Sequence, residues 1–323
     1  MKILVTGGAG FIGSHLIDAL LAGGHEIVCL DDLSLGRMEN ISHLDGRAGF
    51  EFIKQDVLDA GATGSVMRSR GIQTVFHMAA NSDIQKGGES PAVDLEKTFL
   101  TTYRVLDAMR LNGVHDIVFA SSSAVYGDLG KPLTEDSGPL FPVSNYGAAK
   151  LASEAFITSF CENYGLRSWI CRFPNVIGER STHGAIHDFI GRLRQDASKL
   201  RILGDGKQCK PYLYVKDLVD AMLHVWNNSS SQVNCFNLGV EDAISVRKMA
   251  EIVVQEMGLR DVIFDYTGGS RGWVGDVPKF EYSLEKIHEL GWRAIRSSEE
   301  AVRLAVRSSL GIEKSTVRPA GRG

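Results

Sequence analysis

The chain has 323 residues, enough to bury a large core and more than one domain usually holds, so we expect a larger and a smaller domain. The formal net charge is -4 and acidic and basic residues are interspersed, which excludes a basic stripe for nucleic acid and a polybasic patch for a membrane. No apolar run approaches the ~18 residues of a membrane span and no signal-peptide pattern precedes the first expected strand, so we expect a cytoplasmic protein that binds small molecules.

The first 16 residues predict a buried strand, a glycine turn and the start of a helix. Residues 3–5 are an apolar run, and Gly8, Gly10 and Gly13 follow with the spacing of a dinucleotide-binding turn. Such a triplet also occurs in ordinary turns, but a second strand over 26–30 leads directly to Asp31. An acidic residue about 20 positions downstream meets the ribose hydroxyls and repels a 2'-phosphate, which favours NAD over NADP.

Further apolar segments predict strands over residues 50–54, 74–78, 116–120 and 168–172, with helices over 93–111 and 146–164. This alternation predicts an α/β fold with a parallel, right-handed, doubly wound Rossmann sheet in an NAD-binding domain of residues 1–174. From residue 175 the pattern is mixed, with helices near 186–194, 217–226 and 245–257, the last capped by Ser245, and a strand near 234–238. We expect residues 175–323 to form mainly a smaller mixed α/β substrate domain, with some segments returning to the first domain and a frayed tail after Leu310.

Positions at the carboxyl ends of the expected strands are the candidate cofactor contacts, because ligands of open α/β sheets bind there. Asp56 is a candidate adenine contact, and the small pair Ala79-Ala80 would let a cofactor approach the backbone. The full candidate set comprises Gly7, Gly10, Phe11, Ile12, Asp31, Asp32, Ser34, Gly36, Asp56, Val57, Ala79, Ala80, Tyr146 and Lys150.

Cysteines and histidines do not predict a metal site. The five cysteines lack paired metal-ligand spacing and several lie in apolar runs, so we expect reduced core cysteines: Cys29, Cys161, Cys171, Cys209 and Cys235. His77, His183 and His187 are scattered without carboxylate or cysteine partners, and we expect no metal.

Tyr146 and Lys150 are four residues apart near the start of an expected helix and share one face of it. Together with TGGAGFIGSHL, Asp31 and SSSAVYG, in this order and spacing, they make the chain resemble the extended short-chain dehydrogenases. More narrowly, the chain resembles the NAD-dependent sugar-nucleotide epimerases and dehydratases, of the UDP-glucose/galactose 4-epimerase kind, over roughly residues 1–300.

The resemblance implies three catalytic roles. Tyr146 would be the base that takes a proton from a sugar hydroxyl, and Lys150 would favour the phenolate and hold the nicotinamide ribose. Ser122, four residues before Tyr126 of the VYG motif, would orient the reacting hydroxyl. Ser121 and Ser123 are alternatives that could instead be hydrogen bonders at the strand end.

The two positions after Ser122 distinguish the reactions of the family. The 4,6-dehydratases carry Asp and Glu there, whereas this chain has Ser123 and Ala124, so it resembles the 4-epimerases. We expect a UDP-hexose 4-epimerase working through a transient 4-keto sugar. A nucleotide-sugar dehydrogenase, reductase or dehydratase of the same family, and a non-catalytic NAD-binding sensor or scaffold, are the alternatives.

The resemblance also implies substrate contacts from Ser122, Ser123, Asn175, Lys210, Arg271 and Asp276. Lys210 stands where relatives usually carry a diphosphate-binding Arg, which a Lys replaces only as a point charge. Thr98 stands where many relatives have Asn. Relatives pair the helices near 93–111 and 146–164 in a four-helix bundle, and both helices here carry apolar residues on more than one face, so we expect a homodimer.

Overall fold

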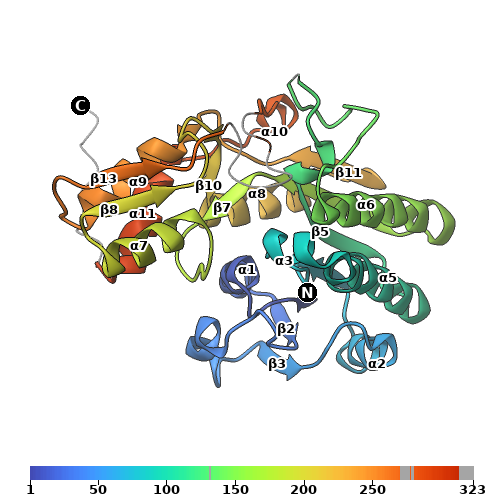
Figure 1. The fold of residues 1–323 in the computed structure, drawn as a ribbon. Helices are drawn as coiled ribbons and strands as arrows, with labels where there is room; N and C mark the ends of the chain where they lie inside the picture. Colours follow the sequence, from blue (N-terminus) through green and yellow to red (C-terminus); the bar gives the residue numbers. More distant parts are fainter. Residues whose placement is uncertain (131, 270–276, 278–279, 313–323) are drawn as a thin grey trace, which may run out of the picture.

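The computed structural model describes residues 1–130, 132–269, 277 and 280–312, which form two lobes (Figure 1). The larger lobe contains a seven-stranded sheet in the order β11-β6-β5-β4-β1-β2-β3, and every pairing in it is parallel. The expected doubly wound Rossmann sheet is thereby confirmed. Its strands are β1 (Lys2–Thr6), β2 (Glu26–Asp31), β3 (Phe50–Lys54), β4 (Thr74–His77), β5 (Asp116–Ser122), β6 (Arg167–Phe173) and β11 (Val233–Asn237).

Alternate residues of each central strand enter different cores, because successive side chains of a strand point to opposite faces. In β1, Ile3 and Val5 belong to one buried cluster and Leu4 to the other. The two clusters lie on opposite faces of the sheet, and helices cover both. The sequences of the central strands are therefore continuous apolar runs. Burying each such side chain contributes about 1.5–3 kcal/mol.

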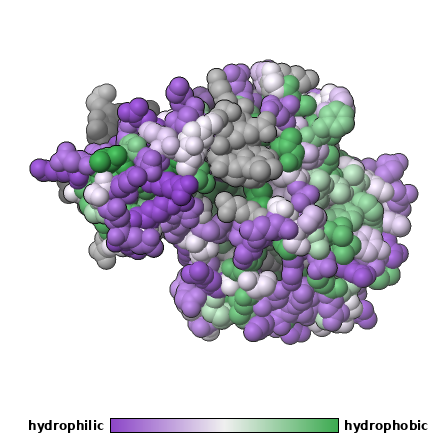
Figure 2. Space-filling model, viewed as in Figure 1, coloured by the Kyte–Doolittle hydropathy of each residue, from purple (hydrophilic) through white to green (hydrophobic). Residues whose placement is uncertain are grey.

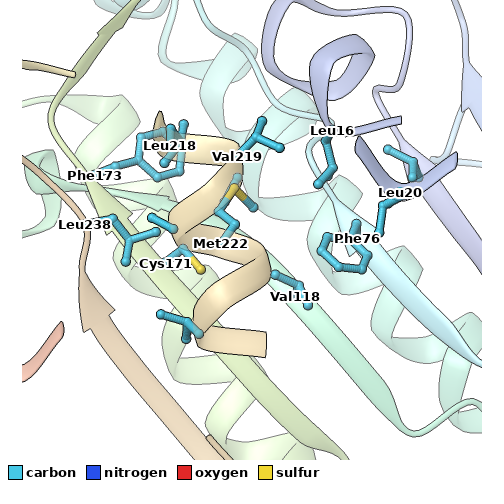
Figure 3. Close-up of a cluster of buried hydrophobic side chains, with 14 of the residues drawn as sticks. Leu16, Leu20, Phe76, Val118, Cys171, Phe173, Leu218, Val219, Met222 and Leu238 are labelled. Atoms are coloured by element: carbon cyan, nitrogen blue, oxygen red, sulfur yellow. The ribbon is translucent and has the colours of Figure 1, made fainter. Parts of the chain in front are cut away.

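Helices cover both faces of this sheet. On one face, Leu16 and Leu20 of α1 and Met222 of α8 meet the strand residues Phe76 and Val118 (Figure 3). On the other face, α2, α5 and α6 complete the second cluster. The bounds of these helices are α1 (Phe11–Ala22), α2 (Ala60–Arg70), α5 (Thr101–Asn112), α6 (Asn145–Tyr164) and α8 (Val215–Asn228).

The smaller lobe lies at the left in Figure 1 and has its own buried cluster, formed by α7, α9 and α11 over short strands. Here β7 pairs with β10 and β8 with β13 in parallel, while β9 pairs with β12 antiparallel. In the space-filling view, mainly hydrophilic residues cover the visible face of this lobe (Figure 2). Its elements are β7 (Asn175–Ile177), α7 (Ala185–Gln195), β8 (Lys199–Ile202), β9 (Cys209–Lys210), β10 (Tyr212–Tyr214), β12 (Ile244–Ser245), α9 (Val246–Glu256), β13 (Ile263–Tyr266) and α11 (Ser298–Leu310). The helix α10 (Glu285–Glu289) belongs to the larger lobe, because Ile287 lies in the same buried cluster as Ile3 and Val5.

Several helix ends follow from local sequence. The Ser245 side chain accepts a hydrogen bond from the backbone N–H of Lys248, which confirms it as the cap of α9. Ser144 caps α6 through the N–H of Gly147, and α6 stops at Gly165, whose φ of 68° is left-handed. The cap therefore places Tyr146 in the first turn of α6.

The structure departs from one expected element. The single helix expected over 93–111 is divided into α4 (Pro91–Asp94), a π-helical segment η3 (Leu95–Leu100) and α5. The later elements α8 and β11 belong to the seven-stranded sheet and its helical layer, and are segments after residue 175 of the kind expected to return to the first domain. The remaining described elements before α6 are α3 (Ile84–Glu89) and the short 3-10 turns η1 (Met38–Asn40), η2 (Ser42–Leu44) and η4 (Ser123–Tyr126). The tail after residue 312 lies outside the described residues.

Candidate active site

The turn between β1 and α1 can pack as closely as it does only because it is built from glycine. Gly7 has a φ of 66°, and its Cα lies so close to Ala79 that an added Cβ would meet the Ala79 nitrogen at 2.7 Å. A Cβ on Gly13 would meet the carbonyl oxygen of Gly7 at 2.3 Å. The helix cap, Gly10, contributes no side-chain hydrogen bond. The N–H groups of the first turn of α1 therefore form the kind of site that binds a phosphate.

Asp31 lies at the end of β2 against this turn, as expected for a ribose contact. Its carboxylate accepts hydrogen bonds from the backbone N–H of Ala9 at 3.0 Å and of Leu33 at 2.8 Å. Burial raises the pKa of Asp31, and the bonds from Leu33 and Ala9 act against that rise. Gly36 is required beside it, because a Cβ there would meet the carboxylate at 2.6 Å.

The other candidate cofactor residues surround the same edge of the sheet. The Asp32 carboxylate accepts from the N–H and hydroxyl of Ser34 at 2.8 and 2.6 Å. Asp56 follows β3 and accepts from the backbone N–H of Leu58. Ala79 and Ala80 follow β4, while Phe11 and Ile12 open α1 and Val57 is buried in the core.

Lys97 joins two of these candidates and was not anticipated. Its ammonium lies 3.2 Å from Asp32 Oδ2 and 3.5 Å from Asp56 Oδ2. A lysine on an expected helix is normally a solvated charge, so the sequence gives no signal for this contact. The strand order, which places the ends of β2 and β3 side by side, creates it.

Ser122, Tyr146 and Lys150 come together where β5 meets the start of α6. The Ser122 hydroxyl is hydrogen-bonded to the Tyr146 phenol, which is half-buried. The Lys150 ammonium is fully buried, donates to the carbonyl oxygen of Ala120 at 2.6 Å and lies 4.7 Å from the centre of the Phe119 ring.

The ionisation of this group is set mainly by burial. Burial raises the pKa of Tyr146 to about 12, with the hydrogen bond from Ser122 opposing the rise and the charge of Asp94 adding to it. Burial also lowers the pKa of Lys150 to about 7, against the opposing charges of Glu154 and Asp94. Without ligands, therefore, the tyrosine is neutral and the lysine is close to losing its proton at neutral pH.

Asp94 is a second residue that the sequence did not single out. Its buried carboxylate accepts from Asn81 Nδ2 at 2.9 Å, and its other oxygen, Oδ2, has no hydrogen-bond partner among the residues that the structure describes. Gly87 packs against that oxygen, and the Gly87 carbonyl accepts from Asn145, the neighbour of Tyr146. Thr98 donates weakly to Asp94 at 3.5 Å and so completes a polar cluster beside α6.

The candidate substrate residues are distributed over other segments. Ser123 begins η4 directly after Ser122, and Asn175 opens β7, where it pairs with Tyr212 of β10. Lys210 ends β9 and pairs with Ile244. Arg271 and Asp276 lie outside the described residues.

Within the described ranges, no group of three His, Cys, Asp or Glu side chains is arranged to hold a metal ion. His77 is fully buried between Thr6 and Thr102, 2.7 and 3.1 Å from their hydroxyls, and burial lowers its pKa to about 3. The His183 ring lies 3.3 Å from the carbonyl oxygen of Ser82. Among the described residues, no helix is long and apolar enough to cross a membrane.

The fold and this edge of the sheet define a class: an α/β protein that binds a dinucleotide beside a Ser, Tyr and Lys cluster. Residues 3–239 match the model of the NAD dependent epimerase/dehydratase family, and the chain belongs to that family.

Known proteins with similar chains include several named as epimerases. The UDP-glucose 4-epimerase of Mycolicibacterium smegmatis is 34% identical over 265 residues, which cover 81% of this chain and 84% of that protein. A crystal structure titled UDP-galactose 4-epimerase is 36% identical with a TM-score of 0.84, over 96% of this chain and 99% of the other. The UDP-glucose 4-epimerase of Thermus thermophilus in complex with NAD is 31% identical with a TM-score of 0.84 and the same coverage.

Proposed function

We propose that this chain is an NAD-dependent nucleotide-sugar 4-epimerase acting on a UDP-hexose through a transient 4-keto sugar. The observation that carries the proposal is the hydrogen bond between Ser122 and Tyr146 near the buried Lys150. Ser123 and Ala124 follow Ser122 directly, at the start of η4. The cluster supplies a base for a sugar hydroxyl. Neither Ser123 nor Ala124 can act as the carboxyl acid or base that elimination of water requires.

Proton transfer is the part of the reaction that we assign to this chain's own residues. Tyr146, as phenolate, takes the proton from the C4 hydroxyl and later returns it, and Ser122 orients that hydroxyl. The pKa of Tyr146 is about 12, raised mainly by burial. We therefore assign to the positive charge of Lys150 the role of favouring the phenolate near neutral pH. Bound NAD supplies the oxidation and reduction at C4.

The cradle for that cofactor is supported by the absence of side chains at the turn after β1. The positive φ of Gly7 and the missing Cβ of Gly13 let the turn pack closely against Ala79 and the start of α1, and we assign the pyrophosphate to the N–H groups at the N-terminus of α1. We assign the adenosine ribose to Asp31, with Asp32, Ser34, Gly36 and Asp56 around it. Lys150 and Tyr146 would hold the nicotinamide ribose.

For the nucleotide sugar, we assign Ser123, Asn175, Lys210, Arg271 and Asp276 as contacts. Lys210 would bind the diphosphate as a point charge, without the two-pronged geometry of an arginine. We keep residues 1–174 as the cofactor domain and 175–323 as mainly the substrate domain. In this division, α8 and β11 are the later segments that return to the cofactor domain, where β11 joins the large sheet.

A substrate panel tests the function. Purified protein is incubated separately with UDP-, GDP-, CDP- and dTDP-hexoses, and the products are separated by chromatography. We expect interconversion of UDP-glucose and UDP-galactose without added reductant. Release of a keto sugar with stoichiometric NADH would instead establish a dehydrogenase.

We further propose a homodimer in the cytoplasm. Large apolar side chains are exposed on and beside α5 and α6, at Leu95, Leu111, Phe156 and Tyr164, and Figure 2 shows hydrophobic residues on the side where Figure 1 places these helices. An exposed apolar patch on paired helices supports a helix-to-helix interface. The five cysteines are free, which suits a reducing compartment.

A further inference from the structure

Three residues of α6, each four positions after the last, contact the end of β5. Tyr146 is bonded to Ser122, the Lys150 ammonium donates to the carbonyl oxygen of Ala120, and Glu154 accepts a short hydrogen bond from the Ser121 hydroxyl. Residues at this spacing lie on one face of a helix. Glu154 therefore repeats, one turn further along, the contact that the two candidate catalytic residues make.

Glu154 is also fixed from the neighbouring strand. The guanidinium of Arg172 on β6 donates to the Glu154 carboxylate through Nη2 at 2.6 Å and through Nε at 3.0 and 3.2 Å. Both residues are buried: the exposed fraction is 4% for Glu154 and 7% for Arg172. Arg172 is also the residue that pairs with Ser121 between β6 and β5. This two-pronged geometry holds the carboxylate in one orientation.

The remaining terminal nitrogen of Arg172, Nη1, also has hydrogen-bond partners. It donates to the hydroxyl of Tyr126 at 3.0 Å and to the carbonyl oxygen of Glu135 at 3.2 Å, and Tyr126 donates to Asn237 at 2.7 Å. A buried polar network whose members all have partners is rigid and specifies one arrangement. Buried ion pairs contribute little net stability compared with apolar residues, so this one calls for another explanation.

We infer that Glu154, held by Ser121 and Arg172, is a positioning residue for the proposed reaction: it locks α6 against β5 and supplies the negative charge that keeps the Lys150 ammonium protonated. The inference rests on the proposed function.

The surroundings of Lys150 support this role. The groups facing its ammonium are Glu154 and Tyr146 on α6, Asp94 on α4, His77 on β4, and the ring of Phe119 with the carbonyl of Ala120 on β5. Burial lowers the pKa of Lys150 to about 7, and the charge of Glu154 is the first that opposes this, followed by Asp94. His77 is neutral near pH 7, because burial lowers its pKa to about 3. Removing the Glu154 charge therefore shifts the deprotonation of Lys150 to lower pH.

The test compares E154Q with the wild type over pH 6 to 10. We expect the alkaline limb of the kcat–pH profile to move to lower pH by about one unit in E154Q, so that kcat falls at alkaline pH. The KM and the amount of bound NAD should stay close to wild type. The matched control is E256Q, which breaks the ion pairs of Glu256 with Arg303 and Arg307 between α9 and α11. It should leave the pH profile unchanged. An unshifted limb with kcat within twofold of wild type in folded E154Q overturns the inference.

Two further variants cover a folding failure and separate the two effects. If E154Q does not fold because Arg172 is left buried and unpaired, the double variant E154Q/R172Q removes both charges, and a smaller shift in the same direction is expected. S121A keeps the charge and removes only the link to β5, so we expect a several-fold lower kcat with an unmoved alkaline limb. A wild-type kcat in S121A would overturn the positioning part.

A readout without turnover distinguishes this inference from the proposed function. The pH titration of the Lys150 ¹³Cε resonance, assigned with K150M, is followed in the protein as purified, without added nucleotide sugar. A lower Lys150 pKa in E154Q supports the inference even if no sugar is epimerised. An unchanged Lys150 pKa overturns it even if epimerase activity is found.

Discussion

Tyr146 is the residue on which the proposed chemistry depends, because its phenol is bonded to Ser122 and stands beside the Lys150 ammonium. In Y146F the ring keeps its packing but loses the proton acceptor. We expect turnover to fall by several orders of magnitude with NAD content unchanged. S122A should cost less, about 10²–10⁴-fold. Steady-state rates and the absorbance of bound cofactor measure both, and a Y146F enzyme with wild-type turnover would refute the assignment.

At the same scale, the sequence identified some partners and could not identify others. Ser122, Tyr146 and Lys150 are recognised from motifs that resemble those of a known family, and the structure brings them together. Lys97 and Arg172 carry no such signal, because their partners are distant in the sequence and meet them only through folding. The partners of Lys97 are 41 and 65 residues away, and that of Arg172 is 18 residues away. The sequence indicates Ser121 as a possible hydrogen bonder at the strand end, but it does not identify the acceptor, Glu154.

At the level of elements, the β1–α1 turn offers a direct test of close packing. In G13A the new Cβ would lie 2.3 Å from the carbonyl oxygen of Gly7, so the turn must shift. We expect weakened NAD binding and a lower melting temperature. The control is G191A, also within a helix, where an added Cβ would meet no atom of the described residues within 4 Å outside the backbone of its own helix and its chain neighbours. There, replacing Gly should stabilise by about 0.5–1 kcal/mol. Calorimetry and cofactor titration compare the two, and equal behaviour would contradict the close-packing argument.

The elements themselves were mostly predictable, because apolar runs of strand length flanked by glycine or acidic residues are strong local signals. The break in the helix near residue 95 was not, since periodicity cannot reveal a π-helical turn. Nor did local pattern place β11, whose five residues could join either lobe. Its pairing with β6 is decided by tertiary packing, in which Phe236 enters the core beneath α8.

For the whole molecule, the proposed homodimer depends on the exposed apolar surface of α5 and α6. Phe156 is 40% exposed and its ring packs edge-on against Phe99 at 5.1 Å. We expect F156E to shift the protein from dimer to monomer in sedimentation at micromolar concentration. I295E, at a site 78% exposed elsewhere, is the matched control and should leave the dimer intact. A monomeric wild-type protein would remove the proposal.

Epimerisation and net oxidation by the whole enzyme differ in the fate of the hydrogen at C4. With Ser123 and Ala124 unable to direct a 4-keto sugar to elimination, that sugar must be reduced again in the same site or escape. The decisive measurement follows UDP-glucose deuterated at C4. The account predicts UDP-galactose that keeps the deuterium, with no steady accumulation of NADH. A released keto sugar with one NADH per turnover would contradict it.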